Sequence, residues 1–272
     1  MKTSFSTLAC PDWSLLEMLA AAANYGYDGV ELRVVSDVLD LWTLPEFQPS
    51  ALLATRALIE DHRLAISSIG TSASFHSPDV EERKRNIESA LRMAEIAAGL
   101  GAPSIRVFGD RIQSGCDRAQ TINWISDSLM QLAARLKSTS VEVWLETHGD
   151  FARAADVSEI FSQLECTQVG IIWDPANAFA QSDEAPFIPP QLSSRIRHAH
   201  LKDMKRDAQG SYRYVLTGEG DFPFRTMFAS LAEIGFGGFV SFEWEKHWHP
   251  ELAPPEIALP HFIEWWKNRE AV

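Results

Sequence analysis

The chain has 272 residues, of which 46% are hydrophobic and 22% are charged, a composition that supports a folded core and excludes disorder as the default interpretation. The formal net charge of −13, without any run of Lys and Arg, argues against a nucleic-acid partner, and no apolar run approaches the roughly 18 residues of a membrane span. Cys10, Cys116 and Cys166 show no paired spacing and residues 1–5 lack an apolar signal-peptide core, so we expect a cytoplasmic protein without disulfides.

Short apolar runs of β-like composition alternate with longer helix-like segments along the chain. The eight β-like runs are 4–9, 29–34, 65–70, 104–109, 141–146, 169–174, 196–202 and 238–243. Such alternation predicts a parallel sheet with helical crossovers, because parallel strands need long connections. A (β/α)₈ barrel needs about 250 residues. The sequence therefore predicts the α/β class and a single domain, a (β/α)₈ TIM barrel that spans residues 1–272.

The segments between these runs have helical periodicity. One apolar stripe comprises Ile122, Ile125, Leu129, Leu132 and Leu136, and a second comprises Ile87, Leu91, Ala94 and Ala98. Spacings of three and four residues place each stripe on one helix face, which can pack against the outside of a barrel.

Local signals predict where helices begin and end. Pro11-Asp12 and Ser77-Pro78-Asp79 indicate helix starts, while Gly99 and Gly101 indicate a helix end. The longest irregular stretches are 181–191, 204–222 and 246–255. All three follow predicted strands, where a barrel builds its active-site loops.

Acidic and histidine side chains end four consecutive predicted strands. In strand 141–146 the apolar residues share the outward face, so Glu146 points into the barrel at its carboxyl-terminal rim. The same alternation turns His200 and Glu243 inward. Asp174 ends the predicted strand that lies between those of Glu146 and His200. Barrel enzymes place their chemistry at this rim.

These four side chains predict a metal site. Three carboxylates held close together repel one another and raise each other's pKa values, and a divalent cation relieves that repulsion. Three oxygen ligands and one imidazole favour one Mn²⁺ or Mg²⁺ ion, with Zn²⁺ or Co²⁺ as alternatives. A single carboxylate at a strand end is usually only solvated, but four such ends in succession favour a shared function.

Short motifs around this rim occur in a recognisable order. They are Leu145-Glu146-Thr147-His148-Gly149, Trp173-Asp174-Pro175-Ala176-Asn177, His198-Ala199-His200-Leu201-Lys202-Asp203, Gly218-Glu219-Gly220 and Phe242-Glu243-Trp244-Glu245-Lys246. The ordered set resembles the xylose isomerase-like TIM barrel superfamily, and more closely its sugar phosphate isomerase/epimerase branch, which includes ketose 3-epimerases and hydroxypyruvate isomerase. The amino-terminal half is similar through Gly26-Tyr27-Asp28-Gly29-Val30-Glu31-Leu32.

This resemblance implies that Glu146, Asp174, His200 and Glu243 bind the metal and that Glu146 and Glu243 also form the acid/base pair. The expected reaction is isomerisation or epimerisation of a sugar, sugar phosphate or keto-sugar by proton transfer through a metal-stabilised enediolate. Ketose 3-epimerases usually carry a histidine three residues after the metal-binding aspartate, and Asn177 stands there in this chain. That departure weakens any transfer of their substrate specificity.

Five further residues near the same rim are predicted to bind the substrate: Arg106, His148, Asn177, Lys202 and Lys246. Lys202 shares the inward parity of the neighbouring histidine, whereas His148 lies just past its strand and has an alternative as a loop residue without a role. Glu31, Arg33 and Arg106 face the interior, where a buried ion pair is the simpler interpretation.

Three other functions share parts of this pattern. A lyase or dehydratase on a keto-sugar or keto-cyclitol would use the same metal and enolate. A DNA-repair endonuclease of AP-endonuclease type would need three metals and additional ligands, which Asn177 and the net charge of −13 argue against. The intact carboxylate pair argues against a non-catalytic sugar-binding barrel. The expected partner is therefore a small carbohydrate, and the sequence leaves open whether the chain forms homo-oligomers.

Overall fold

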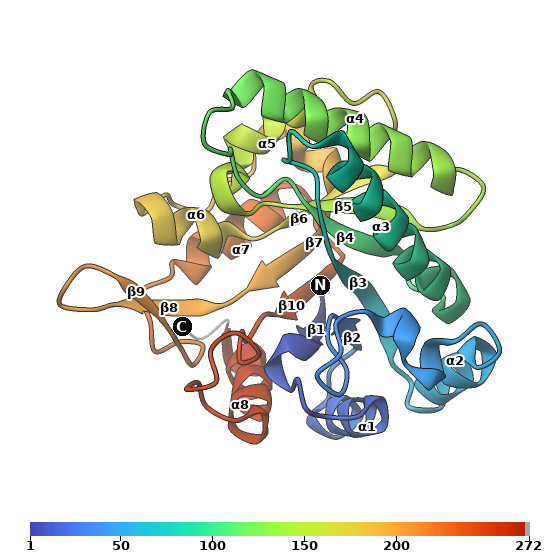
Figure 1. Ribbon diagram of the computed structural model, residues 1–272. Helices are drawn as coiled ribbons and strands as arrows, with labels where there is room; N and C mark the ends of the chain where they lie inside the picture. The colour runs from blue at the N-terminus through green and yellow to red at the C-terminus, as the bar shows by residue number, and fades with distance from the viewer. Residues whose placement is uncertain (270–272) are drawn as a thin grey trace.

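The computed structural model describes residues 1–269 and contains a closed barrel (Figure 1). Its parallel strands follow the order β1-β10-β7-β6-β5-β4-β3-β2 around the barrel. The barrel strands are β1 (Lys2–Ser6), β2 (Gly29–Leu32), β3 (Ala65–Ser74), β4 (Ser104–Phe108), β5 (Glu142–Glu146), β6 (Val169–Trp173), β7 (Ile196–Leu201) and β10 (Phe239–Phe242). The predicted (β/α)₈ TIM barrel of the α/β class is confirmed.

Helices surround the strands, as Figure 1 shows. The α-helices are α1 (Leu15–Tyr25), α2 (Leu52–Asp61), α3 (Val80–Leu100), α4 (Arg118–Leu136), α5 (Ala154–Phe161), α6 (Pro175–Ser182), α7 (Phe224–Glu233) and α8 (Pro255–Asn268). Short 3₁₀ helices are η1 (Thr7–Ala9), η2 (Leu41–Thr43), η3 (Pro45–Phe47), η4 (Gly149–Phe151) and η5 (Pro190–Arg195). Within residues 1–269, no helix combines the length and the apolar character that crossing a membrane requires.

The first predicted strand, 4–9, is displaced toward the carboxyl terminus relative to β1. Residues Thr7–Ala9 form η1 instead, which the Ser6 side chain caps. The Thr7 hydroxyl accepts hydrogen bonds from the backbone nitrogens of Arg33 and Val34 at 2.8 and 3.0 Å. Thr7 thus ties the end of β1 to the residues that follow β2 rather than extending the ladder.

Helix α1 begins later than the Pro11-Asp12 signal predicts. Ser14 caps it, and the Glu17 carboxylate accepts a hydrogen bond from the Ser14 backbone nitrogen at 2.8 Å, which completes a capping box. This reciprocal pair satisfies the first free N–H groups of the helix, so the helix starts at Leu15.

The predicted ends of α3 agree with the structure. The Asp79 side chain caps its amino terminus, and Gly101 ends it with a φ of +76°, in the left-handed region that favours glycine. The apolar stripe of α4 is buried throughout. The stripe of α3 is wrong at Ala98, which is exposed, because Ala97 and Leu100 form the buried face there.

The predicted irregular stretch 204–222 contains a hairpin. Strands β8 (Asp203–Arg206) and β9 (Tyr212–Val215) pair antiparallel and project from the barrel (Figure 1). Because the eight barrel strands run parallel, their carboxyl ends and the loops after them, including this hairpin, meet at one rim.

Candidate metal centre

The four side chains predicted to bind metal converge in the barrel interior. The Nδ1 atom of His200, on β7, lies 3.9 Å from Glu146 Oε1, 3.8 Å from Asp174 Oδ2 and 3.4 Å from Glu243 Oε1. One ligand atom from each residue lies within 4.8 Å of those from the other three, and all four residues are buried. Residues that are far apart in the sequence therefore form one compact group of three carboxylates and an imidazole.

Within residues 1–269, Glu146 Oε2 and His200 Nδ1 have no hydrogen-bond partner. Asp174 Oδ2 is paired with the Lys202 ammonium, at 2.8 Å. At Asp174 the other oxygen, Oδ1, accepts from the backbone nitrogens of Ala176 and Asn177 at 3.0 and 3.3 Å, which leaves Oδ2 facing the group. Buried polar atoms without partners are costly, and a cation among three oxygens and one nitrogen would satisfy them. The residues present therefore fit a divalent metal ion.

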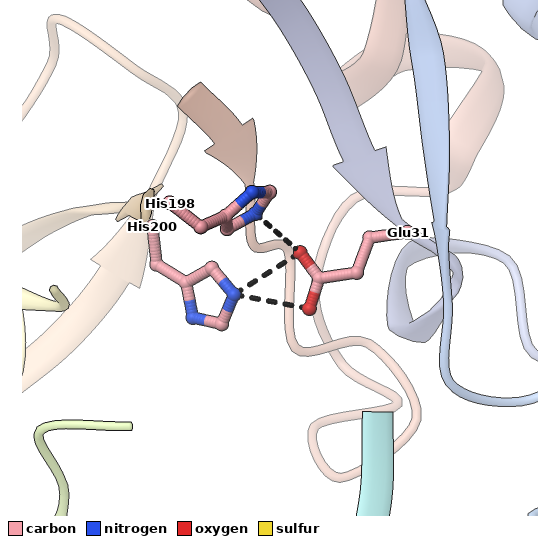
Figure 2. A group of neighbouring side chains, drawn as sticks. All are labelled: Glu31, His198 and His200. Atoms are coloured by element: carbon pink, nitrogen blue, oxygen red, sulfur yellow. Dashed lines mark hydrogen bonds and ion pairs between the residues drawn. The ribbon is translucent and has the colours of Figure 1, made fainter. Parts of the chain in front are cut away.

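A second carboxylate orients the histidine. Figure 2 shows the carboxylate of Glu31, from β2, facing the rings of both His198 and His200. His198 Nε2 donates to Glu31 Oε2 at 2.9 Å, and His200 Nε2 donates to the same carboxylate at 3.0 and 3.1 Å. Burial would lower the pKa of His200, but Glu31 and the carboxylates around Nδ1 raise it well above its ordinary value. With an ion bound, the proton on Nε2 would remain and the Nδ1 lone pair would face the metal, as a metal ligand requires.

The partners of the buried Glu31 carboxylate are two histidines. Burial opposes ionisation of Glu31, but the two imidazoles outweigh it and hold the carboxyl pKa well below its ordinary value. His198 was not among the predicted site residues, although it has the same inward parity as His200.

Lys202 lies inside the acidic group rather than at its edge. Its Nζ atom is 2.8 Å from Asp174 Oδ2, 2.6 Å from Glu243 Oε2 and 2.8 Å from Glu245 Oε1, and the side chain is 1% exposed. Burial would lower the pKa of Lys202, but the three carboxylates raise it well above its ordinary value. The ammonium group is therefore a fixed charge that balances part of the acidic cluster.

Two residues around Lys202 had no role in the sequence prediction. Glu245 accepts from Lys202 and from the Tyr214 hydroxyl, the latter at 3.0 Å. Tyr214 comes from β9, so the hairpin reaches back to the site. Only the spacing from Glu243 to Glu245, which places both carboxylates on the same parity, could have indicated the first of these residues.

The pKa values of two carboxyl groups in this cluster, Glu243 and Asp174, are shifted in opposite directions. Burial raises the pKa of Glu243 to about 7, and Glu146 and Glu245 add to that effect, against Lys202 and His200. At Asp174, burial is outweighed by Lys202 and His200, which hold the pKa well below its ordinary value. The environment thus separates two carboxyl groups of the same cluster.

A cavity of about 220 Å³ opens onto this group. Its walls include Glu146, Glu243, Lys202, Arg106 and His148. The His148 Nδ1 atom lies 3.2 Å from Asp110 Oδ1, which anchors the ring at the edge of the cavity. Arg106 Nε lies 3.3 Å from Glu146 Oε2. The cavity therefore gives a small molecule access to both glutamates.

Two predicted substrate-binding residues point elsewhere. The Asn177 amide donates to the Thr147 carbonyl at 3.0 Å. Lys246 donates to the carbonyls of Pro250 and Leu252 at 2.9 and 2.7 Å. Neither residue is among those that line the cavity, so both side chains hold loop backbone in this structure.

The closed parallel barrel with this acidic group at its carboxyl-terminal rim defines an α/β barrel with a candidate divalent-metal site. Residues 19–269 match the model of the family described as xylose isomerase-like TIM barrel. The chain belongs to this family, as the motifs at the rim predict.

Relatives of known function act in more than one way. A 2-oxo-tetronate isomerase from Pectobacterium atrosepticum is 24% identical over 256 residues, with 86% of this chain and 87% of the relative covered. Inosose dehydratase 2 from Bacillus cereus is 22% identical over 240 residues, with 78% and 79% covered. A solved structure described as the IOLI protein with a binding zinc atom matches with a TM-score of 0.80 at 17% identity and 97% coverage of each chain. At that identity the match shows the fold alone.

Proposed function

We propose that this protein is a divalent-metal-dependent isomerase or epimerase that acts on a small sugar, keto-sugar or sugar phosphate. The observation that carries the proposal is the convergence of Glu146, Asp174, His200 and Glu243 beside a cavity. The similarity to a 2-oxo-tetronate isomerase supports the reaction class.

In this proposal the four side chains hold the metal, and Mn²⁺ or Mg²⁺ suits the three oxygens while Zn²⁺ or Co²⁺ also suits the imidazole. A bound divalent ion would supply Lewis acidity toward a substrate carbonyl and so acidify the neighbouring C–H bond. The carboxylates of Asp174 and Glu243 face Lys202 as well, so the site keeps a fixed positive charge beside the ligands.

Glu146 and Glu243 carry the proton transfer. Glu146 is the last residue of β5 and Glu243 follows β10. These two strands are separated by β6 and β7 around the barrel, so the two carboxylates approach the cavity from different sides. One removes the proton from a carbon beside the carbonyl, and the other returns a proton. Return to the opposite face of the same carbon epimerises the substrate, and return to the neighbouring carbon isomerises it.

A dehydratase is the second candidate, because inosose dehydratase 2 is similar to this chain at nearly the same identity as the isomerase. Both reactions begin with the same proton abstraction. They differ in whether a hydroxyl group then leaves as water, which the mass of the product shows directly.

The test is hydrogen exchange in deuterated solvent with a panel of keto-sugars and their acids, with and without added Mn²⁺. We expect metal-dependent deuterium incorporation that Glu146→Gln abolishes, a loss of at least about 10²-fold for a removed acid/base group. Glu88→Gln, which changes an exposed glutamate paired with Arg135, serves as the control. Normal exchange by folded Glu146→Gln would remove Glu146 from this role, and absence of exchange across the panel would overturn the proposal.

A further inference from the structure

Two arginines are buried in the wall of the same cavity. Arg33 is 5% exposed and Arg106 is 2% exposed, and both line the cavity together with Glu146 and Glu243. Buried guanidinium groups are rare unless they are paired, because moving a charge out of water costs several kcal/mol. Their partners therefore decide what they do.

Arg33 has no carboxylate partner within residues 1–269. Its Nη2 atom donates to the Ser72 hydroxyl at 2.8 Å, and its Nη1 atom has no hydrogen-bond partner. The backbone nitrogen of Arg33 is fixed by Thr7 at 2.8 Å, so the side chain starts from a rigid position. A buried cationic group with an unused donor thus faces the cavity.

Arg106 is only partly neutralised. Its Nε atom lies 3.3 Å from Glu146 Oε2 but makes no hydrogen bond there, and its guanidinium lies 3.9 Å from the centre of the Phe108 ring. Glu146 is also a candidate metal ligand, so its charge is shared.

Gly70, on β3, is what lets the two arginines approach each other. A Cβ atom at that position would lie 2.7 Å from Arg33 Cδ and 2.9 Å from Arg106 Nη2. Burial and the neighbouring Arg106 lower the pKa of Arg33 to about 9, which still leaves it charged at neutral pH. Two positive charges are therefore held side by side in the wall of a cavity that carboxylates also line.

We propose that Arg33 and Arg106 bind an anionic group of the substrate, a carboxylate or a phosphate, beside the metal centre. The inference rests on the proposed function, because the same cavity holds Glu146 and Glu243. A planar guanidinium matches either anion with two parallel hydrogen bonds. The substrate is accordingly a small acidic sugar derivative rather than a neutral sugar, and it would bind in the cavity of about 220 Å³ that these residues line.

Binding of three matched, unreactive probes tests this inference without turnover: glycerate, glycerol 3-phosphate and glycerol, each titrated by calorimetry into metal-loaded protein. We expect at least one anion to bind at least about tenfold more tightly than glycerol, and which one does so identifies carboxylate or phosphate. Equal affinity for all three probes would overturn the inference.

Arg33→Met supplies the residue-specific test. We expect it to weaken binding of the preferred anion by about 10- to 100-fold, because charge-assisted hydrogen bonds to the anion are lost, and to leave glycerol binding unchanged. Arg33→Lys keeps the charge but loses the forked geometry, so we expect an intermediate affinity, and it replaces Arg33→Met should that variant not fold. Unchanged anion affinity in either variant would remove Arg33 from the site.

A stability measurement separates this role from a structural one. Removing a buried charge that has no carboxylate partner within residues 1–269 should leave the melting temperature of the ligand-free Arg33→Met variant unchanged or raise it. A purely structural arginine would give a clear decrease. Deuterium exchange with a neutral keto-sugar keeps the two proposals apart: robust exchange without anion preference would leave the proton-transfer function standing while this inference fails.

Discussion

Replacing Glu31 with glutamine should weaken metal binding while the barrel stays folded. The Glu31 carboxylate accepts from both His198 and His200. A glutamine oxygen in place of Oε2 could still accept from both rings, but the amide nitrogen in place of Oε1 is a donor that faces the His200 N–H, and the negative charge is lost. The His200 ring would then lose the charged acceptor that orients its Nδ1 atom toward Glu146, Asp174 and Glu243.

The size of the effect follows from the position of Glu31 behind the ligand. Mutation of a carboxylate that orients a metal-binding histidine typically lowers metal affinity by about 10- to 100-fold. This corresponds to about 1.4–2.7 kcal/mol of binding free energy. Direct loss of a ligand would cost more, so the variant should still bind the ion at higher concentration.

The assay is competition between the protein and a chelating dye for Mn²⁺, repeated with Zn²⁺. Circular dichroism and the melting temperature of the metal-free protein establish that the variant is folded. Glu31→Asp retains the charge at a shorter reach, and Glu60→Gln, which changes an exposed glutamate paired with Arg56, gives the baseline. If folded Glu31→Gln holds Mn²⁺ as tightly as Glu60→Gln does, the orienting role assigned to Glu31 is refuted.

Two further predictions concern the loop that carries His148. Asp110, whose φ of +69° asparagine tolerates, has a pKa lowered from 3.8 to about 2, chiefly by the hydrogen bond from His148. Because this pKa is depressed, Asp110→Asn should lower the free energy of unfolding by about 1–2 kcal/mol at neutral pH. In urea unfolding, the difference in stability between the two proteins should disappear as the pH falls from about 4 to 2. A difference that does not change with pH would contradict this prediction. Gly149→Ala should lower the free energy of unfolding by about 2–4 kcal/mol, because φ is +58° and the new Cβ would lie 2.0 Å from the Asp110 carbonyl oxygen. Gly115→Ala is the control for backbone strain alone, because φ is +84° and the new Cβ would have no atom of residues 1–269 within 4 Å. It should lower the free energy of unfolding by only about 1 kcal/mol. Equal losses of stability in the two variants would exclude the steric explanation.

Much of the barrel and the acidic group could be predicted because strands have a period of two. Parity alone turned Glu146, His200 and Glu243 inward, and the parallel topology brought their strand ends to one rim. The end of β1 could not be placed in this way, since Thr7 leaves the ladder through a side-chain hydrogen bond to residues after β2.

Side-chain contacts between strands on different sides of the barrel could not be predicted from the sequence. Glu31 on β2 meets His198 and His200 on β7, two strands that are not neighbours in the barrel. Such a contact depends on strand tilt and stagger, which a one-dimensional pattern does not contain. The same limit applies to Tyr214, because the hairpin that carries it looked irregular in the sequence.

Lys202 gives the protein a cation of its own. An ammonium group tethered among Asp174, Glu243 and Glu245 offsets their repulsion from the moment the chain folds, so the barrel need not wait for a metal to assemble. If a divalent ion binds here as proposed, the ammonium group would keep the acidic cluster partly neutralised before the ion binds and after it leaves, so folding would not depend on the metal.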